Sequence, residues 1–435
     1  MRTLFLRPNK PELRPEKFSR RVYCADGYRA EIVRRPIGKF FVGWGIALCV
    51  LLIPLIVMLD VRKDPRVAEF WTTHIQAGWE SFTGHLTSFL PCSVLELLIV
   101  SGIMLGVFLL VRVFINLCKG RFKRIAVGLV VIATFGAYLL NLYIMSMGFG
   151  YYRAEMPVPQ TENKYTASQA RKVVEYFLAD YNRLANSLER DENGCVVCPY
   201  AFGELADIMV EEYKRLDAPF FNGYFAKYTP TAKPVVNSWF LSDMLITGVT
   251  FLPFGEATLN VAAPPTTITS TLAHELAHTK GVQREGDANL LARYILVSSE
   301  NDYLRYCGYY ASFDNLLSAL SLAGDWQSFN ELGVQISPLV AKERRYANAY
   351  WNSQPDIIGQ IAEFFNNLYL KSNGAENGTG SYDNGNKGEV VTPINPDTGE
   401  PEKDPDTGEI VREIEYSQVQ KMYFKIYEEI RSYEL

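Results

Sequence analysis

Histidine is scarce in this chain, with only four among 435 residues. The formal net charge is only −5. The chain therefore has no excess of positive charge, which argues against a nucleic-acid-binding protein. Seven cysteines are present. Cys195 and Cys198 have the spacing of a redox motif but lack a thioredoxin-like context. A zinc knuckle at this pair would need two further ligands, and only Cys92 or Cys307 could supply them. We expect a local disulfide or unpaired thiols at this pair.

Long uncharged runs are concentrated near the N-terminus, although the hydrophobic content of the whole chain is an ordinary 48%. Residues 40–59 and 125–150 carry no charge, and the apolar run 97–111 continues past Arg112. Each run is long enough, or nearly so, to cross about 30 Å of hydrocarbon as a helix. Residues 1–39 are too long and too charged for the n-region of a signal peptide. We therefore predict three transmembrane helices between residues 40 and 150.

Basic residues predict the orientation of these helices. Residues 1–39 contain eleven Lys or Arg and the loop 116–124 contains four, whereas the loop 60–92 contains three against four acids. By the positive-inside rule the N-terminus is cytoplasmic and everything after residue 150 lies outside the cytoplasm. In the loop 60–92, large apolar residues recur at helical spacing between Val67 and Phe82, as in a helix that lies at the membrane surface.

The sequence HELAH at residues 274–278 holds two of the four histidines. On a helix, His274 and His278 lie one turn apart on nearly the same face, so both imidazoles can reach one metal ion. Neutral imidazole suits Zn²⁺, and Glu275 is placed to act as general base on a zinc-bound water. The alternative is an ordinary amphipathic helix with two surface histidines.

A third ligand must come from beyond the helix, because Glu285 on a straight continuation would lie roughly 10 Å past His278. Gly281 allows the chain to turn back, since glycine tolerates a positive φ at a helix end. A second helix then places Glu285 and Asn289 on one face, which predicts Glu285 as the ligand and Asn289 as its supporting partner. Asp287 points elsewhere and fits an acid in a first helical turn.

Three stretches carry a resemblance to a known family: KPVVNSWFLSDMLITGV, FLPFGEATLNVAAPP and AHELAHTKGVQREGDANLLARY, with looser pieces between residues 40 and 385. They resemble the bacterial membrane family called domain of unknown function 3810, a group similar to zinc metallopeptidases. The resemblance implies a protein of the bacterial cell membrane with a gluzincin-like fold and His, His and Glu as zinc ligands. It implies no substrate.

The remaining segments complete the expected architecture. A β-prone run at 245–263 predicts a small sheet, and residues 257–262 are a candidate edge strand for holding a substrate backbone, or a plain structural strand. Residues 372–412 are polar, rich in turn-forming residues and contain the sequence PDTGE twice, which predicts a solvated loop or short exposed hairpin. An apolar stripe within 413–435 predicts a closing helix.

Together these features predict a mainly α protein in which three transmembrane helices precede a mostly helical, zincin-like α+β domain with a small sheet. The predicted segments are a cytoplasmic tail (1–39), a membrane region (40–150), a catalytic domain (151–371), a polar loop (372–412) and a C-terminal helix (413–435). The expected function is zinc-dependent peptide hydrolysis outside the cytoplasm. The alternatives are a silent membrane sensor or scaffold that keeps the metal for structure, and a hydrolase of non-peptide amides. The bilayer is the one predicted partner; the sequence specifies neither the peptide or protein substrate nor the oligomeric state.

Overall fold

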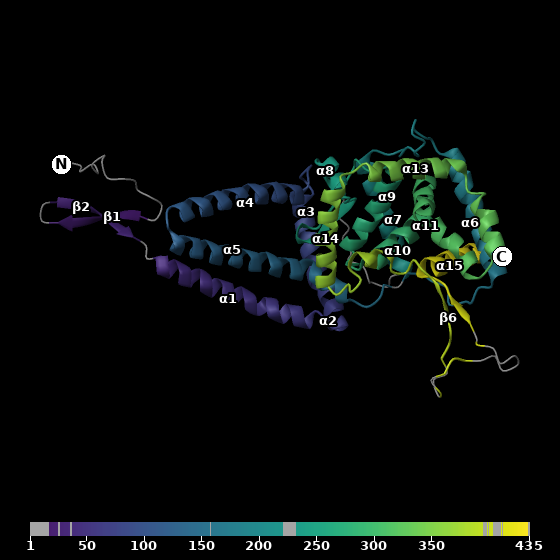
Figure 1. Cartoon of the computed structure of the whole chain (residues 1–435), viewed down its shortest axis with the longest axis horizontal. Coiled ribbons are helices and arrows are strands. Elements are labelled where there is room, and N and C mark those ends of the chain that lie inside the picture. The colour runs from purple at the N-terminus through teal and green to yellow at the C-terminus, as the bar shows by residue number, and fades with distance from the viewer. Residues whose placement is uncertain are drawn as a thin grey trace. The chain divides into compact units, whose positions relative to one another are not determined.

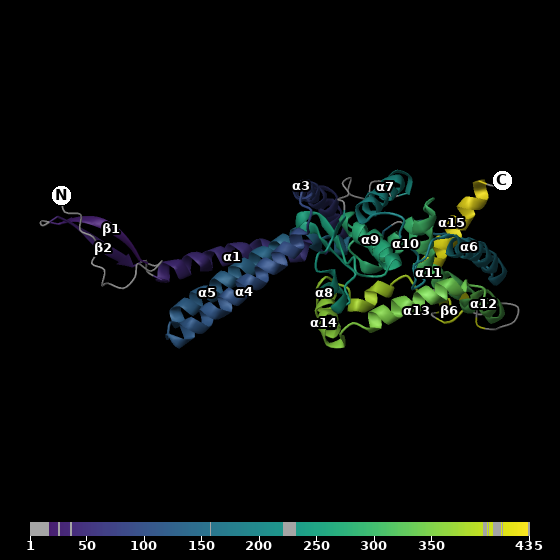
Figure 2. The ribbon, with the colours of Figure 1, turned by 90° about the horizontal axis from the view of Figure 1, so that it is seen from above.

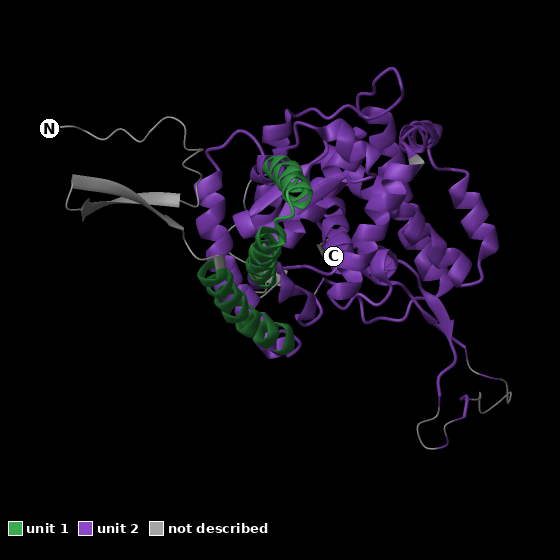
Figure 3. Cartoon of the chain, turned by 60° about the vertical axis from the view of Figure 1, so that its left-hand side comes forward, with its two compact units in different colours: residues 1–60, 101–144 green, residues 61–100, 145–435 purple. Residues whose placement is uncertain are grey.

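The computed structural model describes residues 17–24, 27–34, 37–156, 158–220, 232–394, 398, 400–402, 410 and 412–433. The chain forms two compact units, a small unit of residues 1–60 and 101–144 and a large unit of residues 61–100 and 145–435 (Figure 3). It passes between them at three places, each within or at the end of a long apolar helix.

Among the residues that the structure describes, three helices are long and apolar enough to cross a membrane, which confirms the predicted number. The corresponding spans are Gly38–Val61, Val94–Cys118 and Phe122–Gly148. They belong to α1 (Ile37–Val61), α4 (Val94–Cys118), and α5 (Phe122–Tyr143) with its extension η2 (Ile144–Gly148). Side chains of α5 donate hydrogen bonds to backbone oxygens of α1, from Thr134 to Trp44 and from Asn141 to Leu51. The small unit also contains the antiparallel hairpin of β1 (Lys17–Cys24) and β2 (Gly27–Arg34).

The loop between the first two spans is helical, as α2 (Pro65–Phe70), η1 (Trp71–Gln76) and α3 (Ala77–Thr87). In these helices the distribution of polar and apolar side chains between the buried and exposed faces is the reverse of that in a helix on a soluble domain. Polar side chains such as Thr72, Gln76 and Glu80 are buried, whereas large apolar side chains such as Trp79 and Phe82 are exposed. This pattern agrees with the predicted helix at a membrane surface.

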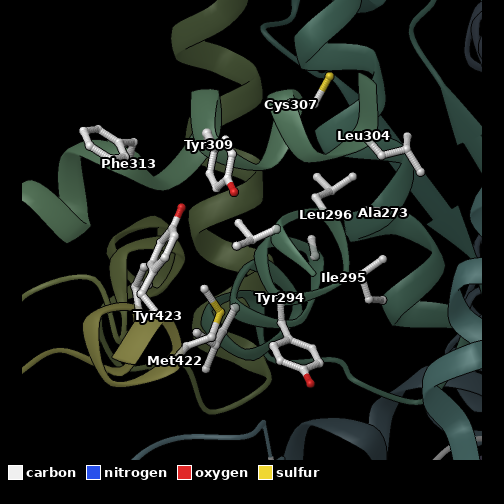
Figure 4. Packing of buried hydrophobic residues seen from close by; sticks show 14 of the residues in the cluster. Ala273, Tyr294, Ile295, Leu296, Leu304, Cys307, Tyr309, Phe313, Met422 and Tyr423 are labelled. Carbon is white, nitrogen blue, oxygen red and sulfur yellow. The ribbon is translucent and has the colours of Figure 1, made fainter. Parts of the chain in front are cut away.

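The large unit is mainly helical, and α9, α10 and α11 lie in its middle (Figures 1 and 2). Apolar side chains of these three helices and of α15 meet in one core (Figure 4). Its helices are α6 (Ala167–Ser187), α7 (Phe202–Phe220), α8 (Ser238–Asp243), α9 (Pro265–Thr279), α10 (Glu285–Val297), α11 (Asp302–Leu322), α12 (Trp326–Gly333), α13 (Pro338–Asn352), α14 (Asp356–Ser372) and α15 (Gln418–Tyr433). Three short 3-10 turns accompany them, η3 (Gly150–Tyr152), η4 (Leu252–Phe254) and η5 (Gly378–Asp383).

The predicted small sheet has three strands in the order β3 (Ala232–Pro234), β5 (Glu256–Leu259) and β4 (Gly248–Phe251). The strand β5 is parallel to β3 and antiparallel to β4. Of the two alternatives for residues 257–262, the edge strand is wrong and the plain structural strand is confirmed, because β5 occupies the centre of the sheet and both of its sides are paired. The strand at the free edge nearest the HELAH helix is β4.

The predicted polar loop 372–412 is not uniform. It contains η5 and the strand β6 (Glu389–Val391), which pairs antiparallel with β7 (Glu413–Glu415) as an exposed hairpin. The expected C-terminal helix is α15, which packs on α11. Cysteines 49, 92, 118, 195, 198 and 307 are all free, so the described part of the chain holds no disulfide between Cys195 and Cys198.

Candidate metal centre

The HELAH sequence lies in the last turns of α9, which begins at Pro265, directly after Pro264, and ends at Thr279. Gly281 then reverses the chain with a φ of +80°, in the left-handed region that favours glycine. A Cβ there would lie 2.5 Å from the Arg153 guanidinium and 2.5 Å from the Thr72 methyl carbon, so the turn also needs a residue without a side chain. The reversal brings the start of α10, at Glu285, back to the histidines.

His274, His278 and Glu285 form a cluster whose potential ligand atoms all lie within 4.8 Å of one another. Nε2 of His274 is 3.1 Å from Nε2 of His278 and 3.2 Å from Oε2 of Glu285, and the remaining separation is 3.5 Å. Ligand atoms held tetrahedrally at the usual Zn–N and Zn–O distances would be about 3.3 Å apart. The spacing of the three atoms therefore fits one zinc ion. In the described part of the chain, this is the one such group of three or more His, Cys, Asp or Glu side chains.

The buried polar atoms of the cluster also fit a cation. Oε2 of Glu285 is buried with no hydrogen-bond donor, although it faces both imidazoles. Nδ1 of His278 is 2.7 Å from the backbone oxygen of Val282; when Nδ1 donates to that oxygen, Nε2 faces the cluster and can bind a cation once its own proton is lost. This is the arrangement that zinc-binding histidines adopt.

The charges of the cluster are strongly coupled. Burial alone would raise the pKa of Glu285, but the two histidines lower it to about 2. Burial would lower the pKa of His278, whereas the Glu285 carboxylate raises it to about 9. A proton on His278 therefore compensates the Glu285 charge, and a metal cation has to displace that proton in order to bind.

Glu275 is buried beside the cluster and is held by a residue of the sheet edge. The Thr250 hydroxyl on β4 lies 2.6 Å from Oε2 of Glu275 and 2.8 Å from the Glu275 backbone oxygen. Gly248, on the same strand, passes so close that a Cβ would lie 2.7 Å from Cγ and 2.8 Å from Oε1 of Glu275. Thr250 therefore engages one carboxylate oxygen, and the other oxygen remains for a proton.

The two other acidic or amide candidates on α10 lie apart from the ligand cluster. Asp287 is 4.0 Å from the Arg284 guanidinium, and burial raises the pKa of its carboxyl to about 6. Asn289 lines the same cavity as the cluster, but its amide donates a 3.0 Å hydrogen bond to the backbone oxygen of Tyr382. Asn289 thus contacts the segment opposite the ligands, whereas its predicted contact is with Glu285.

Tyr382 is a site residue that the sequence did not reveal. It comes from η5, inside the predicted polar loop, and its ring lies 6.3 Å from the His274 ring, centroid to centroid. Burial raises the pKa of its phenol above the usual value, and the charge of Glu285 and a hydrogen bond to Glu285 add to the shift. The phenol therefore stays protonated at physiological pH, and its oxygen accepts a 3.5 Å hydrogen bond from the Asn366 amide.

The cluster opens into a cavity of about 1020 Å³. One wall is the edge strand β4, from Gly248 to Thr250, and Tyr382 contributes another side. The remaining wall is largely apolar and comes from α14 and the residues around α8. The cavity is large enough for several residues of an extended peptide beside the cluster.

A family model described as "Protein of unknown function (DUF3810)" matches residues 71–385. The matched range contains the metal cluster, Glu275, Thr250 and Tyr382. No curated protein and no solved structure matches the chain.

Proposed function

The chain belongs to the DUF3810 family of proteins of unknown function, and we propose that it is a membrane-anchored, zinc-dependent peptidase of the gluzincin type that acts outside the cytoplasm. The observation that carries the proposal is the meeting of His274, His278 and Glu285 with Glu275 in one cavity. A metal site that only stabilised the fold would need no additional carboxylate facing the cavity.

In this proposal, His274, His278 and Glu285 hold the zinc ion. The bound ion would supply Lewis acidity, which lowers the pKa of water and polarises a carbonyl oxygen. Glu275 accepts a proton from the attacking water and later transfers it to the leaving amine nitrogen. Thr250 fixes the Glu275 carboxylate by engaging Oε2, so that Oε1 is the proton-accepting atom.

Tyr382 is the group best placed to stabilise negative charge on the peptide oxygen. Its half-buried ring lies beside the His274 ring, and its phenol is near enough to Glu285 for that charge to raise its pKa. A phenol that stays protonated can donate a hydrogen bond to the oxyanion, and such donors act strongly in sites that exclude water. Asn289 supports this role by holding the Tyr382 backbone.

The edge strand β4 is the place where an extended substrate can bind. One side of β4 is paired with β5, and residues Gly248 to Thr250 line the cavity beside Glu275. A peptide added to an exposed strand edge gains main-chain hydrogen bonds in register, which places its carbonyl groups along the edge. This arrangement favours peptide bonds over isolated amides as the substrate.

The proposal is tested with purified full-length protein, by zinc analysis and by incubation with a degenerate peptide library. The wild type is expected to carry one zinc ion per chain and to cleave peptides, and Glu275→Gln should keep the zinc and lose cleavage. Zinc at full occupancy with no cleavage by the wild type would indicate a silent scaffold. Cleavage of acyl-amides without peptides would indicate a different hydrolase.

A further inference from the structure

The exposed apolar side chains of the large unit gather on three helices. On α14 they recur with helical spacing along one face, with exposed fractions of 55% to 73%. Figures 1 and 2 both show α3, α8 and α14 at the same end of this unit. The side chains concerned are Ile75, Trp79, Phe82, Leu86 and Phe89 in or beside α3, Val236, Trp239, Phe240 and Leu245 in or beside α8, and Ile357, Ile361, Phe364, Phe365 and Leu368 of α14.

These helices are joined by hydrogen bonds to the ends of the spans, all within the large unit. Arg62, directly after α1, donates to Asn373 and to the backbone oxygen of Ser372 at the end of α14, and also to Gly148 at the end of the third span. The carboxylate of Glu96, in the first turn of α4, accepts hydrogen bonds from the start of α8. The apolar faces are thus fixed at the level where the chain enters and leaves its spans.

The short connection to α4 also keeps α3 near the end of a span. Its last residue, Thr87, is separated from the start of α4 at Val94 by six residues, which can extend over at most about 25 Å. The face that α3 turns to the protein is polar, with Gln76 and Glu80 buried, and the face that it turns outward is apolar. Water on the outer side would favour the opposite arrangement, so the surrounding medium is apolar.

The same surface borders the metal cavity. Phe240, Leu245, Ile361 and Phe365 line the cavity and are also between 44% and 62% exposed, so they form its rim. Met147, in the last turn of the third span, lines the cavity as well. The cavity therefore extends from the metal cluster to the apolar surface.

We infer that the face formed by α3, α8 and α14 is embedded in the lipid leaflet next to the site, and that the cavity opens there to take polypeptides that carry a hydrophobic anchor. The second part of this inference rests on the proposed peptidase function. A substrate held in the bilayer is concentrated at the rim, and its chain reaches the metal cluster along the membrane surface.

The lipid contact is tested without any activity measurement. The full-length protein in lipid nanodiscs is treated with an apolar carbene photolabel, and the labelled peptides are mapped by mass spectrometry. Peptides of α3 and α14 should be labelled about threefold or more above those of α12. The helix α12 is the matched control, because Trp326 on it and Val334 directly after it are 60% and 83% exposed, and its side chains Ser328 and Glu331 accept hydrogen bonds from Arg171 of α6. Equal labelling of α12 and α14 would overturn the inference.

The substrate class is tested with one degenerate peptide library in two forms, palmitoylated in vesicles and acetylated in solution. The wild type should cleave the palmitoylated form at least about tenfold faster. Phe364→Ser combined with Leu368→Ser removes part of the lipid face outside the cavity lining and should reduce this preference, whereas Val334→Ser, directly after α12, should not. Zinc content reports on the folding of each variant.

The outcomes separate the two proposals. If neither form is cleaved, the peptidase function fails, while the photolabelling still decides the lipid contact. If both forms are cleaved at equal rates, the peptidase function stands and the anchored-substrate class is overturned.

Discussion

Glu275 is positioned by two residues of β4 rather than by its own helix. The Thr250 hydroxyl contacts Oε2, and the absence of a side chain at Gly248 leaves the room that the carboxylate occupies. The position of the proposed base therefore depends on how closely β4 approaches α9. Small changes on the strand should affect chemistry without affecting the ligands.

Gly248→Ala tests this dependence. The new methyl group would lie within 3 Å of Glu275 and of the Thr271 methyl carbon, so the carboxylate has to move. We expect cleavage to fall by about 10²-fold, as misplacement of a catalytic group by about 1 Å can cause, with zinc content unchanged. The control is Gly203→Ala, where a Cβ meets nothing within 4 Å. Loss of zinc in Gly248→Ala would show that the strand supports the ligands instead.

Tyr382→Phe removes the proposed oxyanion donor and keeps the ring beside His274. Loss of one such donor lowers kcat by about 10²- to 10³-fold in comparable enzymes. We expect a fall of that size with nearly unchanged KM and full zinc occupancy. Tyr346→Phe, on the surface of α13, serves as the control. An unchanged kcat would exclude the phenol from the reaction.

The third ligand is tested by comparing the acidic residues of α10. Glu285→Ala should lose zinc, as should His274→Ala and His278→Ala, because Oε2 of Glu285 completes the set of three atoms. Asp287→Ala should retain zinc, because Asp287 lies beside Arg284 and outside the cluster. Zinc analysis after dialysis distinguishes the two. Retention in Glu285→Ala with loss in Asp287→Ala would reverse the assignment.

At the scale of single elements, α3 packs through buried polar groups. Gln76 donates a 2.7 Å hydrogen bond to Glu80, which is buried, and Lys280 and Arg153 lie near enough to act on its charge. Complete burial raises the pKa of Glu80 well above its usual value, against the lowering effects of Gln76, Lys280 and Arg153. Glu80 is therefore a proton-binding group in the interface between α3 and the turn after α9.

This shift predicts a pH dependence of stability. A carboxyl whose pKa is raised by folding binds its proton more tightly in the folded state, so the free energy of unfolding falls as pH rises above about 4.5 toward the folded pKa. Glu80→Gln keeps the hydrogen bond to Gln76 and should remove this part of the pH dependence. Glu80→Ala should destabilise by about 1–3 kcal/mol at the acid end of the range, because the Gln76 amide loses its acceptor, and by less as pH rises and the wild type loses the stabilisation from the Glu80 proton. Thermal unfolding in detergent from pH 5 to 8 measures both, and identical pH profiles for wild type and Glu80→Gln would contradict the shift.

The local features of the site could be predicted from the sequence, whereas the long-range ones could not. His274, Glu275 and His278 share one helix, and Gly281 turns the chain back to Glu285, so helical spacing, the turn and the faces of the second helix together predict which residues meet. Thr250 reaches the site through the order of strands in the sheet, and β3 has only three residues, too few to give a sequence pattern. For the same reason the central position of β5 was missed.

Tyr382 shows the other limit. The composition around it predicts a solvated loop, because polar residues and glycines dominate. The segment is held instead by its neighbours, with Asn367 accepting a hydrogen bond from the Thr379 amide and Asn289 contacting the Tyr382 backbone. Such contacts depend on tertiary structure. The chain has 26 tyrosines, and nothing in the sequence around Tyr382 distinguishes it from the others as a site residue.

At the scale of the whole molecule, the apolar helices explain how the site is anchored, and the basic residues predict on which side it lies. Lys119 and Arg121 lie between the second and third spans, and Lys123 and Arg124 lie in the first turn of the third; this basic segment is predicted to be cytoplasmic. With three spans, the residues after the third span are then predicted to lie on the opposite side. The orientation decides which polypeptides the proposed peptidase can meet.

A reporter enzyme that is active only outside the cytoplasm tests this orientation. Fused at Glu162, between the third span and α6, it should be active, because an odd number of spans follows a cytoplasmic N-terminus. Fused at Gly120, in the basic loop, it should be inactive, and a reporter active only in the cytoplasm should give the opposite pair of results. Activity at Gly120 with inactivity at Glu162 would invert the protein in the membrane. Equal results at both positions would mean that the third apolar helix does not span, and the site would then lie on the same side as the basic loop.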